Sequence, residues 1–125
     1  MRWRSGARGY VIANYEAKYA DPVTFRRGEE VVVSDRVDRW RENPEWLWIW
    51  CTDARGKSGW VPAGAIERRG ATGLGSRDYS AVELSVTAGE ALTVEEELSG
   101  WLLCATDDGR RGWVPLDCVE AAAEG

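Results

Sequence analysis

A stretch of fifteen residues that occurs twice decides the fold of this protein. Residues 48–62 are WIWCTDARGKSGWVP, and residues 101–115 are WLLCATDDGRRGWVP. The copies align without a gap, and both contain the first Trp, the Cys, two Gly and the final Trp-Val-Pro. A match of this length predicts that one supersecondary unit is present twice.

Each copy has the pattern of a β-hairpin. Apolar residues alternate from Trp48 to Cys51, a polar turn with Gly follows, and a second short run ends at Trp-Val-Pro. Because proline has no N–H to donate to a neighbouring strand, we expect the second strand to end there.

Matching elements precede both hairpins. Gly28-Glu29 and Gly89-Glu90 predict turns, and each is followed by alternating apolar residues typical of a strand. An apolar triplet and a Tyr lie further upstream: residues 23–25 and Tyr15 in the first copy, residues 84–86 and Tyr79 in the second. The first copy also has a longer loop at about residues 38–45.

Composition excludes most catalytic chemistry. The chain has 125 residues, with eight Trp and no His. It therefore has no Ser-His or Cys-His pair and no imidazole ligand, and its three Cys form no CxxC pair. We expect no enzyme activity, no metal site and no cofactor, and we expect the cysteines to be small buried core residues.

Charge is distributed unevenly along the chain. The net charge of −5 disfavours nucleic acid as a partner. Residues 1–70 carry 13 Lys or Arg against 10 Asp or Glu, whereas residues 71–125 carry 3 against 11. This split favours two units with opposite net charges that attract each other.

Targeting signals are not evident in the sequence. No apolar run approaches the ~18 residues of a membrane span, and the Arg-containing start lacks the apolar stretch of a signal peptide. We therefore expect a reduced, soluble, cytoplasmic protein with no membrane partner.

The order of these motifs resembles the SH3 domain family, and the resemblance occurs twice. The first copy matches the family signature at residues 11–15, 23–25, 28–29, 48–51 and 59–65. The second copy matches it at residues 75–79, 84–86, 89–90, 101–104 and 112–118. Nearly the whole chain is covered, although Trp3 and Trp40 have no counterpart in the family pattern.

The resemblance implies an all-β fold of two consecutive five-stranded SH3-like β-barrels joined by a short Gly-rich linker. We expect barrels at residues 9–68 and 74–121, a linker at 69–73, and flexible termini at 1–8 and 122–125. The expected core residues are Val11, Val23, Phe25, Val31, Val33, Ile49, Cys51, Val61 and Ile66, then Leu84, Val86, Leu92, Val94, Cys104, Val114 and Val119.

The resemblance also implies a groove in each barrel. In this family, aromatic side chains and a Pro bind a polyproline II ligand, and an acidic loop selects its Lys or Arg. The implied binding residues are Tyr15, Glu16, Asp21, Trp48, Trp60 and Pro62 in the first barrel, and Tyr79, Glu83, Trp101, Trp113 and Pro115 in the second. Each barrel lacks two signature tyrosines, which are replaced by Ala13 and Ala65 in the first and by Arg77 and Cys118 in the second. Pro22 stands at the usual acidic position of the first barrel.

Three functions remain open at this stage. The first is a non-catalytic adaptor that binds an extended, proline-containing or basic segment of a protein partner in its aromatic grooves. The second is a rigid tandem structural module whose barrels dock on each other without ordinary PxxP binding. The third is an aromatic cage for a quaternary ammonium group, formed by Tyr15, Glu16, Trp48 and Trp50.

Overall fold

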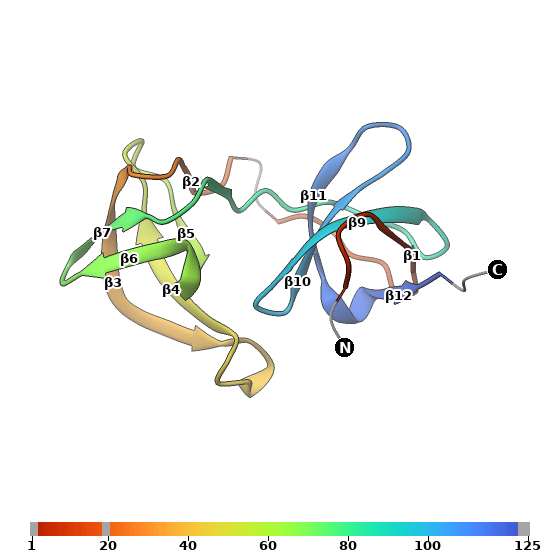
Figure 1. Ribbon diagram of the computed structural model, residues 1–125, viewed down its shortest axis with the longest axis horizontal. Helices are drawn as coiled ribbons and strands as arrows, with labels where there is room; N and C mark the ends of the chain where they lie inside the picture. The colour runs from red at the N-terminus through yellow and green to blue at the C-terminus, as the bar shows by residue number, and fades with distance from the viewer. Residues whose placement is uncertain (1–2, 19–20, 123–125) are drawn as a thin grey trace. The chain divides into compact units, whose positions relative to one another are not determined.

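The computed structural model describes residues 3–18 and 21–122, which form strands, turns and short 3-10 helices. The strands are β1 (Ala7–Val11), β2 (Thr24–Phe25), β3 (Glu30–Arg39), β4 (Leu47–Thr52), β5 (Ser58–Pro62), β6 (Ile66–Arg69), β7 (Thr72–Gly75), β8 (Tyr79–Ser80), β9 (Ala91–Leu98), β10 (Trp101–Ala105), β11 (Arg111–Pro115) and β12 (Val119–Ala121). The 3-10 helices are η1 (Trp40–Glu42), η2 (Ala63–Ala65) and η3 (Leu116–Cys118). The chain forms two compact units, of which unit 1 comprises Met1–Tyr19 and Glu83–Gly125, and unit 2 comprises Ala20–Val82 (Figure 1).

Unit 1 contains a five-stranded antiparallel sheet with the order β11-β10-β9-β1-β12. Strand β1 belongs to the first sequence repeat, whereas the other four strands of the sheet belong to the second. Tyr10 of β1 lies opposite Ala91 of β9 and opposite Glu120 of β12. Strand β1 therefore completes a sheet that the second repeat leaves one strand short.

Unit 2 contains an equivalent sheet with the order β5-β4-β3-β7-β6, together with a short ladder of β2 and β8. Here β7 and β8 come from the second repeat and the other strands from the first. Gly73 of β7 lies opposite Val31 of β3 and opposite Arg68 of β6. The two sheets have the same strand order, and each has received its fourth strand from the other repeat.

The repeats thus exchange their first strands, and this was not expected from the sequence. The expected barrels at residues 9–68 and 74–121 follow the repeats, whereas each compact unit combines strands of both. Backbone hydrogen bonds show the equivalence, because Val11 N–H donates to Glu90 O and Gly75 N–H donates to Glu29 O, both at 2.9 Å. Val11 therefore holds in unit 1 the place that Gly75 holds in unit 2.

A tight turn between the repeats gives the physical reason for the exchange. The expected linker at residues 69–73 is part of a β-hairpin, in which Arg69 of β6 lies opposite Thr72 of β7. The turn consists of Gly70 and Ala71, and Gly70 has φ +72°, a conformation that Gly adopts readily. Because the turn is so short, β7 folds directly onto β6, where the first strand of the first repeat would otherwise lie.

The described parts of the chain ends, where the sequence predicted flexible termini, contact unit 1. Trp3 N–H donates to the Glu97 carboxylate at 2.9 Å, and the Trp3 side chain packs against the core. At the other end, Ala122 N–H donates to Arg8 O at 3.0 Å. The remaining residues of the two expected flexible ends lie outside the described residues.

The two Gly-Glu motifs form the predicted turns. Gly28 and Gly89 have φ +86° and +98°, a region that favours Gly over other residues. In each motif the Glu carboxylate accepts the backbone N–H three residues earlier, from Arg26 at 2.8 Å and from Thr87 at 2.6 Å. Gly supplies the backbone conformation and Glu closes the turn, so both residues recur together.

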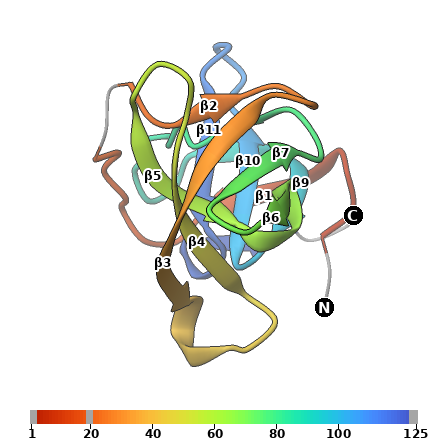
Figure 2. The same cartoon turned by 90° about the vertical axis from the view of Figure 1, so that its left-hand side faces the viewer.

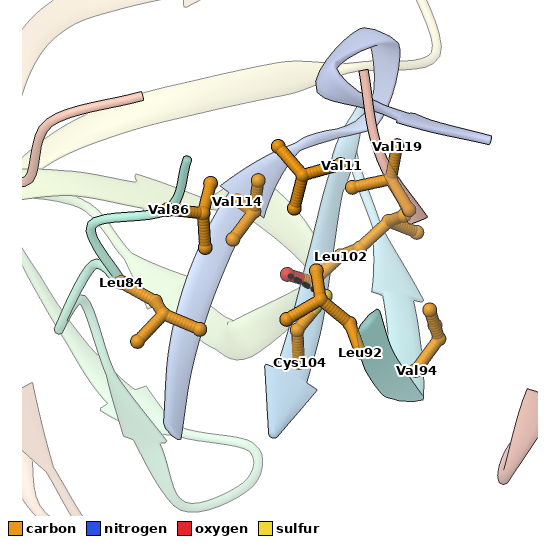
Figure 3. Close-up of a cluster of buried hydrophobic side chains, with 9 residues drawn as sticks. All are labelled: Val11, Leu84, Val86, Leu92, Val94, Leu102, Cys104, Val114 and Val119. Carbon is orange, nitrogen blue, oxygen red and sulfur yellow. Dashed lines mark hydrogen bonds between the residues drawn. The ribbon is translucent and has the colours of Figure 1, made fainter. Parts of the chain in front are cut away.

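All sixteen expected core residues are buried. Val11, however, belongs to the core of unit 1, where its eight buried neighbours come from the second repeat (Figure 3). Leu102 is a further member of this cluster, and its side chain has no exposed surface. Removal of this apolar surface from water stabilises unit 1, and it attaches the N-terminal strand to the second repeat.

The long loop expected at residues 38–45 is largely the tip of a hairpin. Strand β3 continues to Arg39, which lies opposite Leu47 of β4, and Trp40 N–H donates to Trp46 O at 2.9 Å. Figure 2 shows β3 running as one bent strand toward this tip.

Candidate functional site

The strand exchange redistributes the predicted binding residues between the units. Unit 1 contains Tyr15 and Glu16 from the first repeat, with Glu83, Trp101, Trp113 and Pro115 from the second. Unit 2 contains Asp21, Trp48, Trp60 and Pro62 from the first repeat, with Tyr79 from the second. Each unit therefore has one of the predicted Tyr, two Trp and one Pro, but it draws them from both repeats.

Tyr15, Glu83 and Trp101 lie together in unit 1. Tyr15 Oη donates to Glu83 Oε1 at 2.7 Å, and the backbone N–H of Lys18 donates to the same oxygen at 3.1 Å. The rings of Tyr15 and Trp101 meet edge to face, with centroids 5.7 Å apart, an arrangement that aromatic pairs prefer. A carboxylate is thus fixed beside an aromatic pair.

Gly112 brings the acidic segment close to Trp113. A Cβ at Gly112 would lie 2.8 Å from the carbonyl carbon of Glu83 and 2.9 Å from the nitrogen of Leu84, so a larger residue would displace backbone. Leu84 N–H donates to Trp113 O at 3.0 Å, and Pro115 then ends β11. The Gly-Trp-Val-Pro motif therefore sets the distance between Glu83 and the last strand of the hairpin.

A pocket of about 720 Å³ adjoins Tyr15 in unit 1. Its lining residues are Asn14, Tyr15, Glu16, Ser85, Val86, Thr87, Glu90 and Arg110. Arg110 Nη2 donates to Glu90 Oε1 at 2.6 Å, and Nη1 donates to Ser85 O at 3.1 Å. Sequence reasoning missed Arg110 and Glu90, which both belong to the second repeat, and the exchange adds Tyr15 and Glu16 beside them.

Asp21, the acidic residue predicted for the first groove, is paired within unit 2. Arg55 Nη1 donates to Asp21 at 2.8 Å, and Lys57 Nζ lies 3.7 Å from its other oxygen. The hydrogen bond from Arg55 holds the pKa of Asp21 below its ordinary value. The two predicted acids therefore differ, since Asp21 is paired with cations, whereas Glu83 accepts from a phenol and a peptide N–H.

Trp60 is part of a cation–π cluster in unit 2. Its ring meets that of Trp50 edge to face at 5.3 Å between centroids. The guanidinium of Arg36 lies 4.5 Å from the Trp50 centroid and 5.4 Å from the Trp60 centroid. Tyr79 packs on Phe25, with centroids 5.6 Å apart. Each of these aromatic residues therefore packs on another aromatic side chain of the same unit.

Comparison with protein-family profiles identifies both repeats. The profile of the Variant SH3 domain matches residues 8–69 and 70–121. The chain belongs to the variant SH3 domain family. Comparison with curated proteins finds no relative. SH3 domains are generally non-catalytic protein-interaction modules, and each variant SH3 domain defined by sequence here contributes strands to both units.

The indoles expected to line the grooves of these variant SH3 domains are largely buried. Trp48, Trp101 and Trp113 have exposed fractions of 8%, 9% and 5%. Tyr15 and Trp60 are half-buried. The aromatic surface open to a ligand is therefore smaller than the sequence predicted.

Two further expectations change because the variant SH3 domains exchange strands. The expected aromatic cage is not assembled within one unit, since Tyr15 and Glu16 belong to unit 1 and Trp48 and Trp50 to unit 2. Counted by unit, unit 1 has six Lys or Arg against eleven Asp or Glu and a net charge of −5, whereas unit 2 has ten of each. The units therefore do not carry the opposite net charges expected for the repeats.

Two of the three cysteines are core residues, as expected. Cys51 and Cys104 have no exposed surface, and burial raises the pKa of their thiols to about 11 and about 12. Cys118 is half-buried. The described residues include no His, Cys, Asp or Glu group of three or more that could hold a metal ion. No helix in the described ranges is long and apolar enough to cross a membrane.

Proposed function

We propose that unit 1 is a peptide-binding site for an extended basic segment of a protein partner, with Tyr15, Glu83 and Trp101 as its recognition groups. The observation that carries this proposal is the hydrogen bond from Tyr15 Oη to Glu83 Oε1, which fixes an acidic group beside the aromatic pair. An ordered acceptor loses less side-chain freedom when a ligand binds.

The remaining acceptor capacity of Glu83 suits a cationic ligand. Among the contacts of the described residues, both hydrogen bonds to this carboxylate end on Oε1. The other oxygen, Oε2, can accept from an Arg or Lys of the ligand in a charge-assisted hydrogen bond. The net charge of −5 on unit 1 also attracts a basic segment and accelerates its association.

The test is a titration of the full chain with a peptide rich in Pro and Arg, followed by amide and indole NMR shifts. We expect shifts concentrated at Tyr15, Glu83 and the Trp101 indole, and weaker binding at higher salt. Glu83→Gln should weaken binding about tenfold, since a charge-assisted bond is replaced by a neutral one. The matched control is Asp21→Asn, which removes an acid already paired with Arg55 and should leave the affinity unchanged.

Absence of any shift at Tyr15 or Trp101 with millimolar peptide would overturn the proposal. Equal losses for Glu83→Gln and Asp21→Asn would also contradict it, because a general charge effect would then replace recognition by one carboxylate.

A structural role without peptide binding is the second candidate. It is favoured by the burial of Trp48 and Trp101, at 8% and 9% exposed. On this view the indoles stabilise the module and present no ligand surface. The same titration separates the candidates, since a structural module leaves the indole shifts unchanged at every peptide concentration.

A further inference from the structure

One core position distinguishes the two exchanged strands by size. In unit 1, Val11 of β1 lies in the same buried cluster as Val86, and Val86 pairs with Tyr15. In unit 2, Gly75 of β7 lies against Phe25, and Phe25 pairs with Tyr79. Val11 and Gly75 are therefore equivalent strand positions, and Val86 and Phe25 are their equivalent core partners.

Unit 2 has no room for a side chain at this position. A Cβ at Gly75 would lie 2.6 Å from the backbone oxygen of Arg26, and 2.8 Å and 3.1 Å from two ring carbons of Phe25. Because the nearest of these atoms belongs to the backbone, a rotamer change cannot relieve the contact. The first strand of the first repeat would place Val11 at this point.

Unit 1 has the opposite requirement. Val11 is 2% exposed and is a member of the core cluster. Gly at this position would leave a void in this cluster, and a void loses both the burial of apolar surface and van der Waals contacts. The exchanged arrangement therefore avoids both a clash and a cavity.

We propose that each barrel selects the strand it accepts by this size difference, so that the barrel with Phe25 takes a Gly strand and the barrel with Val86 takes a Val strand. The pairing of Val11 with the second repeat and of Gly75 with the first repeat is then a property of the core, in addition to the short turn at Gly70 and Ala71. The selection does not depend on peptide binding.

A second contact discriminates in the same direction. Arg8 of β1 forms an ion pair with Asp107 at 3.0 Å and donates to Thr93 at 2.9 Å. Thr72 holds the equivalent place in unit 2, opposite Val32. Strand β1 would lose both polar partners in unit 2, although the ion pair is exposed and contributes less than the core position.

The experiment reports strand partners by engineered disulfides. Tyr10 lies opposite Glu120 in the exchanged chain, whereas without exchange it would take the place of Leu74, opposite Glu67. Pair A is Tyr10→Cys with Glu120→Cys, and these two cysteines can form a disulfide only in the exchanged chain. Pair B is Tyr10→Cys with Glu67→Cys, and these two cysteines can form a disulfide only without exchange. All variants carry Cys118→Ser, and mass spectrometry of the oxidised protein locates the bond.

Ten Gly or Ser residues are inserted between Gly70 and Ala71 in every variant, so that the short turn no longer decides the outcome. Such an insert spans up to about 33 Å. In this lengthened chain we expect the disulfide yield of pair A to exceed that of pair B by roughly tenfold or more. A clash or a void of this size shifts the equilibrium between the two arrangements by at least that factor. The double variant Val11→Gly and Gly75→Val reverses the sizes, and we expect pair B to predominate.

Two results would overturn the proposal. If pair B already predominates in the lengthened chain with Val11 and Gly75 intact, the turn alone specifies the exchange. If the double variant still forms pair A, the core position does not select the strand.

Stability provides a measurement that remains decisive when a variant folds poorly. Val11→Gly and Gly75→Val should each destabilise the lengthened chain, and the double variant should be more stable than the sum of the two losses predicts, because changing partners restores both fits. A double variant that is unfolded, or whose loss equals that sum, contradicts the size selection.

Discussion

The two units fix the same hairpin turn with opposite chemistry. In unit 2 the turn between β4 and β5 is tied to the neighbouring segment by a buried acceptor, the carboxylate of Asp53. In unit 1 the turn between β10 and β11 is tied by an exposed donor, the guanidinium of Arg110. The repeats are alike in pattern, but they place their stabilising groups at different depths.

Asp53 concentrates several interactions in one side chain. It accepts the backbone N–H groups of Thr24 at 3.0 Å, Arg55 at 2.8 Å and Lys57 at 3.0 Å. The side chain is only 1% exposed, so water competes little for its carboxylate oxygens. The closure of unit 2 therefore depends strongly on a single carboxylate.

Unit 1 spreads the same task over weaker groups. Thr106 stands in the place of Asp53, and its hydroxyl accepts the backbone N–H of Arg110 at 3.0 Å. The Arg110 side chain reaches Ser85 and Glu90 and is 46% exposed. Exposed pairs contribute little because water and salt screen them, so no single group in this turn of unit 1 is as important as Asp53.

The largest expected effect is the loss of unit 2 stability in Asp53→Ala. Three backbone donors lose their acceptor in a part-buried turn, and we expect a loss of about 3 kcal/mol in the free energy of unfolding. Native-state hydrogen exchange of the β4 and β5 amides measures it. Thr106→Ala is the matched control and should cost unit 1 about 1 kcal/mol, measured at β10 and β11. Equal losses would remove the contrast between the units.

The second comparison uses the Gly before each final Trp. A Cβ at Gly112 would meet the backbone of Glu83 at 2.8 Å, whereas a Cβ at Gly59 would meet only the Val23 side chain at 3.0 Å. Gly112→Ala should therefore cost about 2 kcal/mol, and Gly59→Ala less than about 1 kcal/mol because a side chain can move aside. Denaturant titration with unit-specific amide signals checks the order, and a reversed order would contradict the geometry.

The sequence predicts the core well because its apolar spacing is local. Val31, Val33 and Cys51 are buried as expected, since strand alternation fixes the side chains that face inward. The Gly-Glu turns are predicted for the same reason. The exchange is not predicted by this pattern, because both repeats begin with a strand that carries Gly at the same register, Gly9 and Gly73, and continue to a Tyr.

The sequence groups the candidate binding residues by repeat, whereas the structure distributes them by unit, because long-range strand pairing decides which unit each residue joins. Tyr15 fits either barrel by its motif, and only the strand partner places it beside Trp101. The strand positions that we propose as discriminating are Val11 and Gly75. Whether a side chain is accommodated there depends on contacts with residues far away in the sequence. The sequence pattern assigns a residue to one face of a strand, but it does not show which of the two barrels that strand joins.

Acid should weaken the Asp53 turn of unit 2. Burial of Asp53 raises its pKa, but the N–H groups of Thr24 and Lys57 and the guanidinium of Arg55 lower it, and the net pKa lies below the ordinary value. A lowered pKa means that the stabilisation is present above about pH 4 and is lost as pH falls below it. We expect β4 and β5 amides to lose protection in that range. Asp53→Asn should flatten this dependence, and an unchanged slope would exclude Asp53 as its source.

The smallest expected effect is that of Arg110→Ala on unit 1. Its bonds to Ser85 and Glu90 lie at an exposed surface, so the loss of protection at β10 and β11 should be small and should vanish at high salt. Arg55→Ala is the matched change in unit 2, where the guanidinium donates to the buried Asp53 at 3.0 Å. Its effect should be larger and should persist in salt, since a buried carboxylate then loses a donor. If Arg110→Ala lost as much amide protection as Arg55→Ala, and the loss persisted at high salt, the burial of the stabilising group would not distinguish the two turns.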